Sequence, residues 1–171
     1  MTSVRLAQHD AAAAAPFRDR ILELWPSVFG PVADEHQWRT GFWEQHRGRA
    51  DFRLITAEGG DSLLGFAWGC TGERGQWWAD MVHAAIEADA DDWVGGHFEV
   101  VELAVGPEHR GSGLGGALFD ALLADLEHDR ALLQTDVDPD GAGHRLYRRR
   151  GWTVLGELSP GKVIMGTRLA A

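Results

Sequence analysis

Seven residues in the second half of the chain have the composition of an anion site: Arg110, Gly111, Ser112, Gly113, Leu114, Gly115 and Gly116. They follow an apolar run, residues 97–105, that favours an extended backbone. After them, apolar residues recur at spacings of three and four, which predicts a helix. The first amides of a helix have no internal partner, and glycines let a phosphate reach them. The pattern therefore predicts a pyrophosphate site, with the Arg110 guanidinium as an additional donor.

Two other glycine motifs were compared with this loop. Residues 111–116 satisfy G-x-G-x-x-G, and Asp136 lies twenty residues beyond Gly116, as in dinucleotide-binding domains. However, five residues separate the strand from the first glycine, about a hundred precede the motif and only 35 follow Asp136. All three observations count against a dinucleotide-binding domain. A P-loop is excluded because the lone lysine, Lys162, is far from the glycines.

Two motifs, and the strand before the first of them, resemble the GCN5-related N-acetyltransferase (GNAT) superfamily. Residues 110–115 resemble its R/Q-x-x-G-x-G/A signature, residues 101–105 are similar to the strand before it, and residues 146–152 resemble its L-Y-x-x-x-G-F/W segment. The resemblance covers about residues 51–169. It implies an α/β fold, a single N-acetyltransferase domain over residues 1–171. Its mixed, mostly antiparallel sheet would have about six to seven strands, splayed at the centre and flanked by helices.

The resemblance also implies acetyl-CoA as the cofactor. It gives the pyrophosphate to Arg110, Gly111, Ser112, Gly113, Leu114 and Gly115, and the pantetheine arm to backbone groups of Leu103, Ala104 and Val105. Family members often carry asparagine seven residues before the tyrosine of the second segment, where this chain has Asp140. Asp140 accepts hydrogen bonds but cannot donate one as an amide does, so its cofactor contact departs from the family pattern.

Two carboxylates, Glu99 and Glu102, interrupt the apolar strand, although a buried carboxylate costs free energy unless it is paired. Strict alternation puts them on opposite faces, and a β-bulge would change that parity. The resemblance favours Glu99 as the catalytic base, with Glu102 as the alternative and His97 as a third option. The alternative to a catalytic role is a structural one, in which the carboxylate forms a salt bridge to an arginine of the final helix.

Aromatic residues supply the remaining site candidates. Tyr147, the one tyrosine, matches the family's thiolate-protonating tyrosine, and the alternative is a packed ring with a satisfied hydroxyl. Trp38, Trp77 and Trp78 are candidates for the substrate pocket, although large aromatics at helical spacing, such as Trp38, usually form core. Trp77 and Trp78 lie in residues 72–96, which we interpret as an insertion on the substrate side.

Hydrophobic periodicity and turn residues predict the other elements. We expect strands over residues 4–7, 52–58, 63–71, 131–135, 152–158 and 163–169. Asp10 is a plausible N-cap for a helix that Pro26 ends or kinks at Trp25. A second helix begins near Asp34 or Glu35, and a short helix covers residues 142–150.

Composition limits the partners. The net charge of −10 argues against nucleic acid or an anionic membrane as the main partner. No segment approaches the length of a membrane span and no export signal is evident, so we expect a cytoplasmic protein. Cys70 stands alone, which excludes an intrachain disulfide or a cysteine-based zinc site, and no metal is expected. The sequence leaves monomer or homodimer open.

The sequence therefore predicts an acetyl-CoA-dependent N-acetyltransferase that moves the acetyl group to a primary amine of a small molecule by direct attack in a ternary complex. An aminoglycoside-like compound or a polyamine would suit this chemistry. Two alternatives stay open: a non-catalytic acyl-CoA-binding module, and a peptide or protein N-acetyltransferase.

Overall fold

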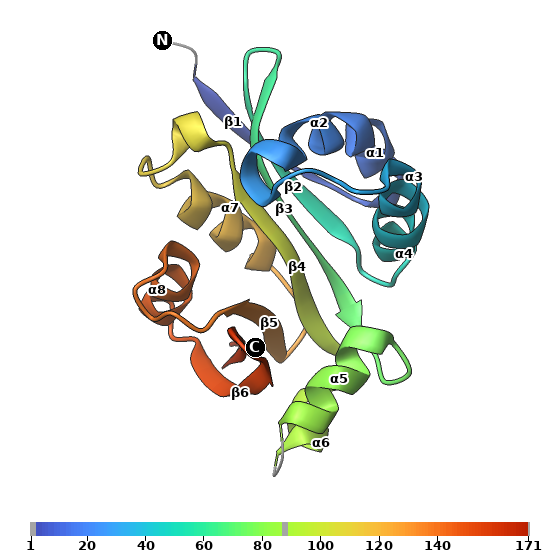
Figure 1. Cartoon of the computed structure of the whole chain (residues 1–171), viewed down its shortest axis with the longest axis vertical. Coiled ribbons are helices and arrows are strands. Elements are labelled where there is room, and N and C mark those ends of the chain that lie inside the picture. The colour runs from blue at the N-terminus through green and yellow to red at the C-terminus, as the bar shows by residue number, and fades with distance from the viewer. Residues whose placement is uncertain (1–2, 87–88, 171) are drawn as a thin grey trace. The chain divides into compact units, whose positions relative to one another are not determined.

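Figure 1 shows a computed structural model of the chain, which describes residues 3–86 and 89–170. Seven strands form one sheet in the order β1 (Val4–His9), β2 (Arg53–Gly59), β3 (Ser62–Gly72), β4 (His97–Val105), β5 (Arg130–Asp136), β7 (Lys162–Arg168) and β6 (Thr153–Ser159). The β1–β2, β2–β3, β5–β7 and β6–β7 pairs are antiparallel, whereas β4 and β5 are parallel. The predicted mixed α/β fold with a sheet of this size is confirmed.

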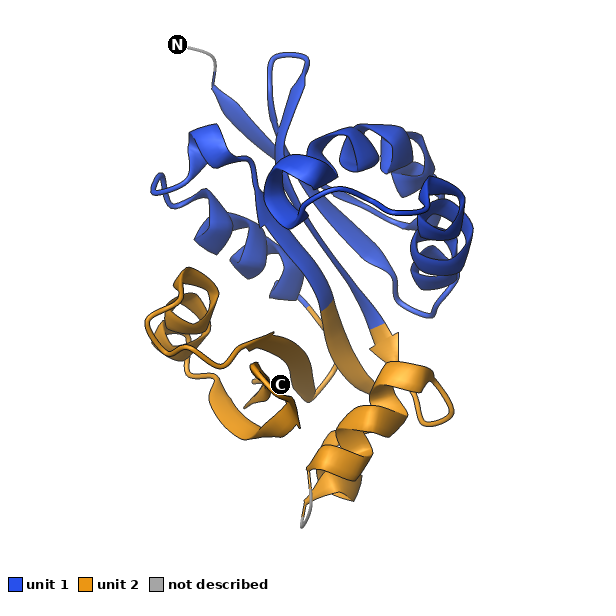
Figure 2. Ribbon diagram, viewed as in Figure 1, with its two compact units in different colours: residues 1–70, 101–125 blue, residues 71–100, 126–171 orange. Residues whose placement is uncertain are grey.

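The chain divides into two compact units (Figure 2). Within the described residues, unit 1 contains residues 3–70 and 101–125, and unit 2 contains residues 71–86, 89–100 and 126–170. Strands β3 and β4 each begin in one unit and end in the other. The single domain expected over residues 1–171 stays a prediction.

Six short helical segments precede β2 in unit 1: α1 (Ala11–Ala14), η1 (Ala15–Phe17), α2 (Arg18–Phe29), α3 (Glu35–Gln37), the π-helical segment η2 (Trp38–Trp43) and α4 (Glu44–Arg47). The predicted N-cap Asp10 is present, and Asp34, near which a second helix was predicted to begin, is an N-cap as well. The Asp10 carboxylate accepts the Ala13 N–H at 2.9 Å, and the Asp34 carboxylate accepts the Gln37 N–H at 3.0 Å. Each side chain satisfies one of the first helical amides, which fixes where the helix begins.

The expectation that Pro26 ends the helix at Trp25 is wrong, because α2 continues through Pro26 to Phe29, and a kink at Trp25 stays a prediction. Proline removes one donor from the helix, but its carbonyl still accepts the Gly30 N–H at 3.0 Å. The Ser27 hydroxyl donates to the Leu24 carbonyl at 2.7 Å, which satisfies another acceptor of this turn. These two bonds hold the last turn in place beyond the proline.

Helices cover both faces of the strands in unit 1. Phe66, Trp68 and Cys70, at alternate positions of β3, pack in one cluster with residues of α2 and η2 on the same face. Gly65 faces the other way, where a Cβ would lie 3.0 Å from Leu118 of α7 (Leu114–Leu123). A larger residue at position 65 would clash first with the Ala104 carbonyl of β4, at 2.7 Å, and then with Leu118 of α7.

Helix α7 presents Leu114, Leu118 and Leu122 as the buried stripe that its sequence predicts. Its last carbonyls are bound by a side chain from β2, because the Arg53 guanidinium donates to the carbonyls of Leu122 at 3.3 Å and Ala124 at 2.7 Å. A cation at this end is favourable because the helix C-terminus carries partial negative charge. Arg53 thereby links α7 to the sheet.

In unit 2, the connection between β3 and β4 contains α5 (Trp77–Ala85) and α6 (Ala90–Trp93). Val82 and Ile86 pack with Leu132 of β5 and Ile164 of β7, so the connection has its own apolar contact with the strands. Helix α8 (Ala142–Arg149) lies at the other face of β5, because Gly143 faces Thr135, three residues after Leu132. Among the described residues, no helix is long and apolar enough to cross a membrane.

Candidate active site

The glycine loop of unit 1 has the geometry of an anion site. Gly111 and Gly113 adopt positive φ angles of +75° and +83°, which favour glycine. Gly113 is the N-cap of the ten-residue helix α7, and no side chain caps that end. A Cβ at either glycine would meet no atom within 4 Å, so the space in front of the loop is open. The first amides of α7 are therefore accessible to an anionic ligand.

Three contacts hold the loop in shape. The Ser112 hydroxyl donates to the His109 carbonyl at 2.6 Å, which folds the loop back on the 3₁₀ turn η3 (Pro107–His109). Gly115 lies against the strand, since a Cβ there would be 3.6 Å from Val105 Cγ2. The Gly106 N–H donates to the Leu64 carbonyl at 2.8 Å.

Arg110 is exposed and forms no hydrogen bond or ion pair with the described residues, so its guanidinium can take a phosphate.

These residues fit the pyrophosphate of coenzyme A. The loop offers uncapped amides, open space and one unpaired cation, as the sequence predicts for Arg110, Gly111, Ser112, Gly113, Leu114 and Gly115. The strand before the loop, β4, carries Leu103, Ala104 and Val105, the candidates for the pantetheine arm. Their individual roles stay predictions.

Strand β4 pairs with β5 near the start of both strands, through Phe98 with Ala131 and Glu99 with Leu132. Further along β4, Val101 and Ala104 both pack against the aromatic cluster of unit 1. Strict alternation would place residues three apart on opposite faces, so this contact pattern favours a bulge between them.

Glu99 is buried, with 4% of its surface exposed, on the part of β4 that belongs to unit 2. Its carboxylate lies beside Gly72 of β3, where a Cβ would come within 3.0 Å of Oε2. Glu102 is half-buried and lies on the part of β4 that belongs to unit 1. Because Glu99 is more deeply buried than Glu102, water screens the charge of its carboxylate less.

His97, two residues before Glu99, borders the same glycine. Its ring is fully buried, and a Cβ on Gly72 would lie 2.3 Å from Nε2 and 2.5 Å from Cε1. The Gly95 N–H donates to Nδ1 at 3.1 Å, which places the proton of the neutral ring on Nε2. Burial, reinforced by the charges of Arg130 and His128, lowers the pKa of His97 to about 4. His97 is thus a neutral donor at Nε2, which disfavours it as a base.

The Gly95 peptide is held from its other side by Arg130, the first residue of β5. The Arg130 guanidinium donates to the Gly95 carbonyl and, at 2.9 Å, to the Trp93 carbonyl. Gly95 itself adopts a φ of +106°, which a side chain would disfavour. Arg130 therefore fixes the backbone that selects the His97 tautomer.

This arrangement of Gly72, Gly95 and Arg130 was not predicted from the sequence. The double glycine at positions 95 and 96, just before the strand with the candidate base, was the available signal. The arginine was not recognisable, because it lies 35 residues from Gly95.

Tyr147 lies on α8 with 8% of its surface exposed. Its carbonyl accepts the N–H groups of Arg150 at 3.0 Å and Trp152 at 3.1 Å, which ends the helix. Gly143 accommodates the ring, since a Cβ there would lie 3.5 Å from Tyr147 Cε2 and 3.3 Å from Thr135 Oγ1. The proton-donating role of Tyr147 stays a prediction, as does a cofactor contact of the exposed Asp140, whose N–H donates to Asp138 at 2.9 Å.

The three candidate substrate tryptophans lie in different environments. Trp38 is buried and stacks on Trp43 with ring centroids 6.2 Å apart. Trp77 is 76% exposed. The Trp78 indole donates to Gln134 at 2.6 Å, and its ring centroid lies 6.4 Å from that of His97. Trp78 is therefore the one of the three that borders the His97 and Glu99 cluster, and a substrate contact stays a prediction for all three.

Solved structures share this fold. They include a GNAT-family acetyltransferase of Bacillus cereus (12% identity, TM-score 0.65, 99% of each chain covered) and the ribosomal-protein-S18-alanine N-acetyltransferase of Escherichia coli (13%, 0.65, 99% of this chain and 96% of that one). A third is the PaiA N-acetyltransferase of Thermoplasma acidophilum in complex with coenzyme A (14%, 0.60, 98% and 99%). At these identities the likeness concerns the fold alone.

Sequence comparisons agree with the fold. A GCN5-like protein acetyltransferase of Mycobacterium tuberculosis is 36% identical over 99 residues, which cover 53% of this chain and 48% of the relative, so the match spans about half of each. The model of the acetyltransferase (GNAT) family matches residues 18–152. The chain therefore belongs to the acetyltransferase (GNAT) family, an enzyme family that uses acetyl-CoA as the acetyl donor.

Proposed function

We propose that this chain transfers the acetyl group of acetyl-CoA to a primary amine of a small molecule, by direct attack in a ternary complex. One observation carries the proposal. Strand β4 bears the buried Glu99 near one end and runs at its other end into the uncapped glycine loop of α7. A single strand thus connects a candidate base to a phosphate site.

Each residue has a role in this proposal. The amides of α7 and Arg110 hold the two phosphates, and backbone groups of residues 103–105 hold the pantetheine arm. Bound acetyl-CoA supplies the acetyl group as a thioester, an acyl carrier that amines attack directly. A backbone N–H of β4 polarises the thioester carbonyl and stabilises the oxyanion.

Two proton transfers complete the reaction. The Glu99 carboxylate accepts a proton from the acceptor ammonium, so that the nitrogen lone pair can form the C–N bond. The Tyr147 hydroxyl donates its proton to the sulfur as the C–S bond breaks. The products are an amide and free coenzyme A thiol. His97 Nε2 forms no direct hydrogen bond with the described residues, so its N–H is suited to orient the Glu99 carboxylate through one bridging water.

The acceptor has two candidates. A small cationic amine suits the net charge of −10. The name of the relative from Mycobacterium tuberculosis, a protein acetyltransferase, favours a protein amine as the second candidate. Both acceptors need the same base and acid, so the catalytic residues do not discriminate between them.

The test is a screen for thiol release from acetyl-CoA over polyamines, aminoglycosides, amino acids and peptides with a free N-terminus or lysine. We expect release above the hydrolysis rate with at least one small amine, and loss of that excess in Glu99→Gln. Release with peptides alone would support the second candidate. Binding of coenzyme A without release from any amine would contradict an enzyme and support the non-catalytic module.

A further inference from the structure

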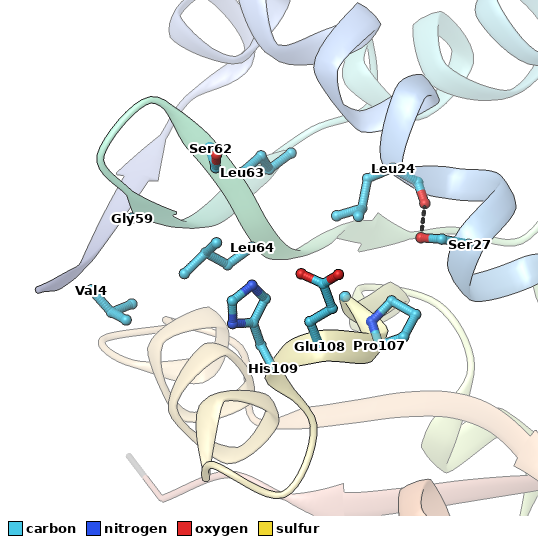
Figure 3. Close-up of a pocket in the computed structure, with 11 residues that line it drawn as sticks. Val4, Leu24, Ser27, Gly59, Ser62, Leu63, Leu64, Pro107, Glu108 and His109 are labelled. Carbon is cyan, nitrogen blue, oxygen red and sulfur yellow. Dashed lines mark hydrogen bonds between the residues drawn. The ribbon is translucent and has the colours of Figure 1, made fainter. Parts of the chain in front are cut away.

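A cavity of about 660 Å³ lies within unit 1 (Figure 3). Three parts of the unit form it: Leu24 and Ser27 of α2, the β2–β3 hairpin, and the turn that joins β4 to α7. Val4 of β1 closes one side. Its volume falls in the range of small-molecule sites, roughly 300–1,000 Å³.

The walls of the cavity are mainly apolar, with one charged side chain among them. Leu24, Leu63 and Leu64 provide aliphatic surface, and Glu108 provides the one carboxylate of the lining. Figure 3 shows the side chains of Glu108 and His109 pointing from the turn toward the hairpin. Glu108 forms no ion pair or hydrogen bond with any of the described residues. The carboxylate is therefore available to a ligand.

The Ser27 hydroxyl is already used as a donor, because it bonds to the Leu24 carbonyl at 2.7 Å. It can still accept a hydrogen bond from a ligand. An unpaired carboxylate and a hydroxyl acceptor above aliphatic walls suit a ligand with a protonated amine and an apolar body. An anion, including the phosphates of the cofactor, is disfavoured beside Glu108 because like charges repel.

From this arrangement we propose that the cavity binds an amphiphilic amine, at a site separate from the glycine loop. The ammonium group pairs with Glu108, and the apolar body lies on Leu24, Leu63 and Leu64. Two hydrogen bonds hold the cavity wall and the glycine loop together. The Gly106 N–H donates to the Leu64 carbonyl, and the Ser112 hydroxyl of the loop donates to the His109 carbonyl. A bound amine would thus contact the turn that positions the loop.

The test uses the whole chain and three probes with the same apolar body: 4-phenylbutylamine, 4-phenylbutan-1-ol and 4-phenylbutyrate. Methyl signals of Val4, Leu24, Leu63 and Leu64 are followed by NMR during each titration, without acetyl-CoA. We expect saturable shifts with the amine, weaker binding of the alcohol and none of the carboxylate. Glu108→Gln should weaken amine binding about 2- to 5-fold, as for a partly exposed ion pair, and leave alcohol binding unchanged.

Two further variants make the result specific. Glu23→Gln removes an exposed carboxylate from α2 outside the lining, and amine affinity should not change. Ser27→Phe fills the cavity from an exposed position and should abolish binding of both probes, with a normal melting curve as the check on folding. Absence of shifts at the four residues up to millimolar amine would overturn the proposal. So would shifts that persist in Ser27→Phe, or equal effects of Glu23→Gln and Glu108→Gln.

Discussion

His97 and Glu99 border one glycine, and no larger residue fits between them. A Cβ on Gly72 would lie 2.3 Å from His97 Nε2 and 3.0 Å from Glu99 Oε2. The imidazole is fixed as a donor by the Gly95 N–H, and Arg130 fixes Gly95 in turn. The buried carboxylate therefore has a neutral N–H group on its side of the strand, and this relationship can be tested apart from the base itself.

We expect His97→Phe, which keeps the ring but removes the donor, to lower kcat/KM about 10- to 100-fold. The estimate corresponds to one hydrogen bond to a charged group, roughly 1.5–3 kcal/mol, made here through a bridging water because His97 Nε2 has no direct partner among the described residues. The acidic limb of the pH profile should move to higher pH, because a carboxylate that loses a donor binds its proton more tightly. His97→Gln, which offers an N–H at a similar distance, should recover part of the rate. An unchanged pH profile in His97→Phe would show that the ring only fills space.

The base itself is tested by Glu99→Gln. Positioned proton transfer is worth about 10²–10⁴-fold, so the rate with amines should fall in that range while coenzyme A affinity stays nearly intact. The defect should shrink as pH rises, because the amine then loses its proton without help. Glu102→Gln is the matched variant on the same strand. If it shows this pattern and Glu99→Gln does not, Glu102 is the base.

Local patterns in the sequence were sufficient for most of the fold. The stripe of α7 was predicted because burial of one helix face imposes its own period on the residues, whereas β2 and β3, which are buried on both faces, were recognised from their apolar runs and the turn residues between them. Asp10 was identified as a cap, and the start of a helix was placed near Asp34, because each carboxylate acts within three residues. The glycine loop was identified because the residues that would bind the phosphates are consecutive in the sequence.

Features that depend on distant partners were not predicted. The continuation of α2 through Pro26 and the π-helical turn at Trp38–Trp43 depend on the surrounding contacts, which override local propensity. The His97 tautomer depends on Arg130, which is remote in sequence from the Gly95 carbonyl it binds. The cavity beside Glu108 combines four separate segments, so no single stretch indicated it.

The cofactor site is tested by Gly113→Val. A side chain at a φ of +83° is strained and would occupy the open space in front of the α7 amides, so we expect coenzyme A binding to be lost while the protein stays folded. Gly161→Val is the matched control, since Gly161 has a φ of +84° and equally open space in the β6–β7 turn. Normal coenzyme A affinity in Gly113→Val by calorimetry would contradict the assignment. Arg110→Ala should weaken binding less, because water screens an exposed contact.

Stability should fall as the pH drops from about 6.5 to about 4. Burial lowers the pKa of both His46 and His97 from 6.5 to about 4, so in this window the unfolded chain binds protons that the folded chain does not. Each histidine therefore adds a slope of up to about 1.4 kcal/mol per pH unit, and neither contributes above the unfolded pKa. Asp19 and Asp80 have lowered pKa values and lose their contribution only at lower pH.

Urea unfolding at pH 7, 6 and 5 measures this slope. His46→Phe should reduce the pH dependence of the free energy of unfolding by the contribution of one titrating histidine. His36→Phe, at an exposed position, should leave the pH dependence unchanged. A slope that is the same in wild type and His46→Phe would mean that His46 titrates alike in the folded and unfolded chain.

Tyr147→Phe separates catalysis from packing at α8. The ring lies against Gly143 and near Trp152, at a centroid distance of 6.2 Å, and phenylalanine keeps those contacts while it removes the one hydroxyl. A thiolate that leaves without a proton is a poorer leaving group, so the tetrahedral intermediate collapses backward more often. We expect kcat to fall about 10- to 1000-fold, with the KM for acetyl-CoA nearly unchanged because the phosphate contacts lie elsewhere. The free energy of unfolding should change by no more than about 1 kcal/mol, the net value of one hydrogen bond. A lower melting temperature with full turnover would instead identify Tyr147 as a packing residue, and a water molecule would then be the acid.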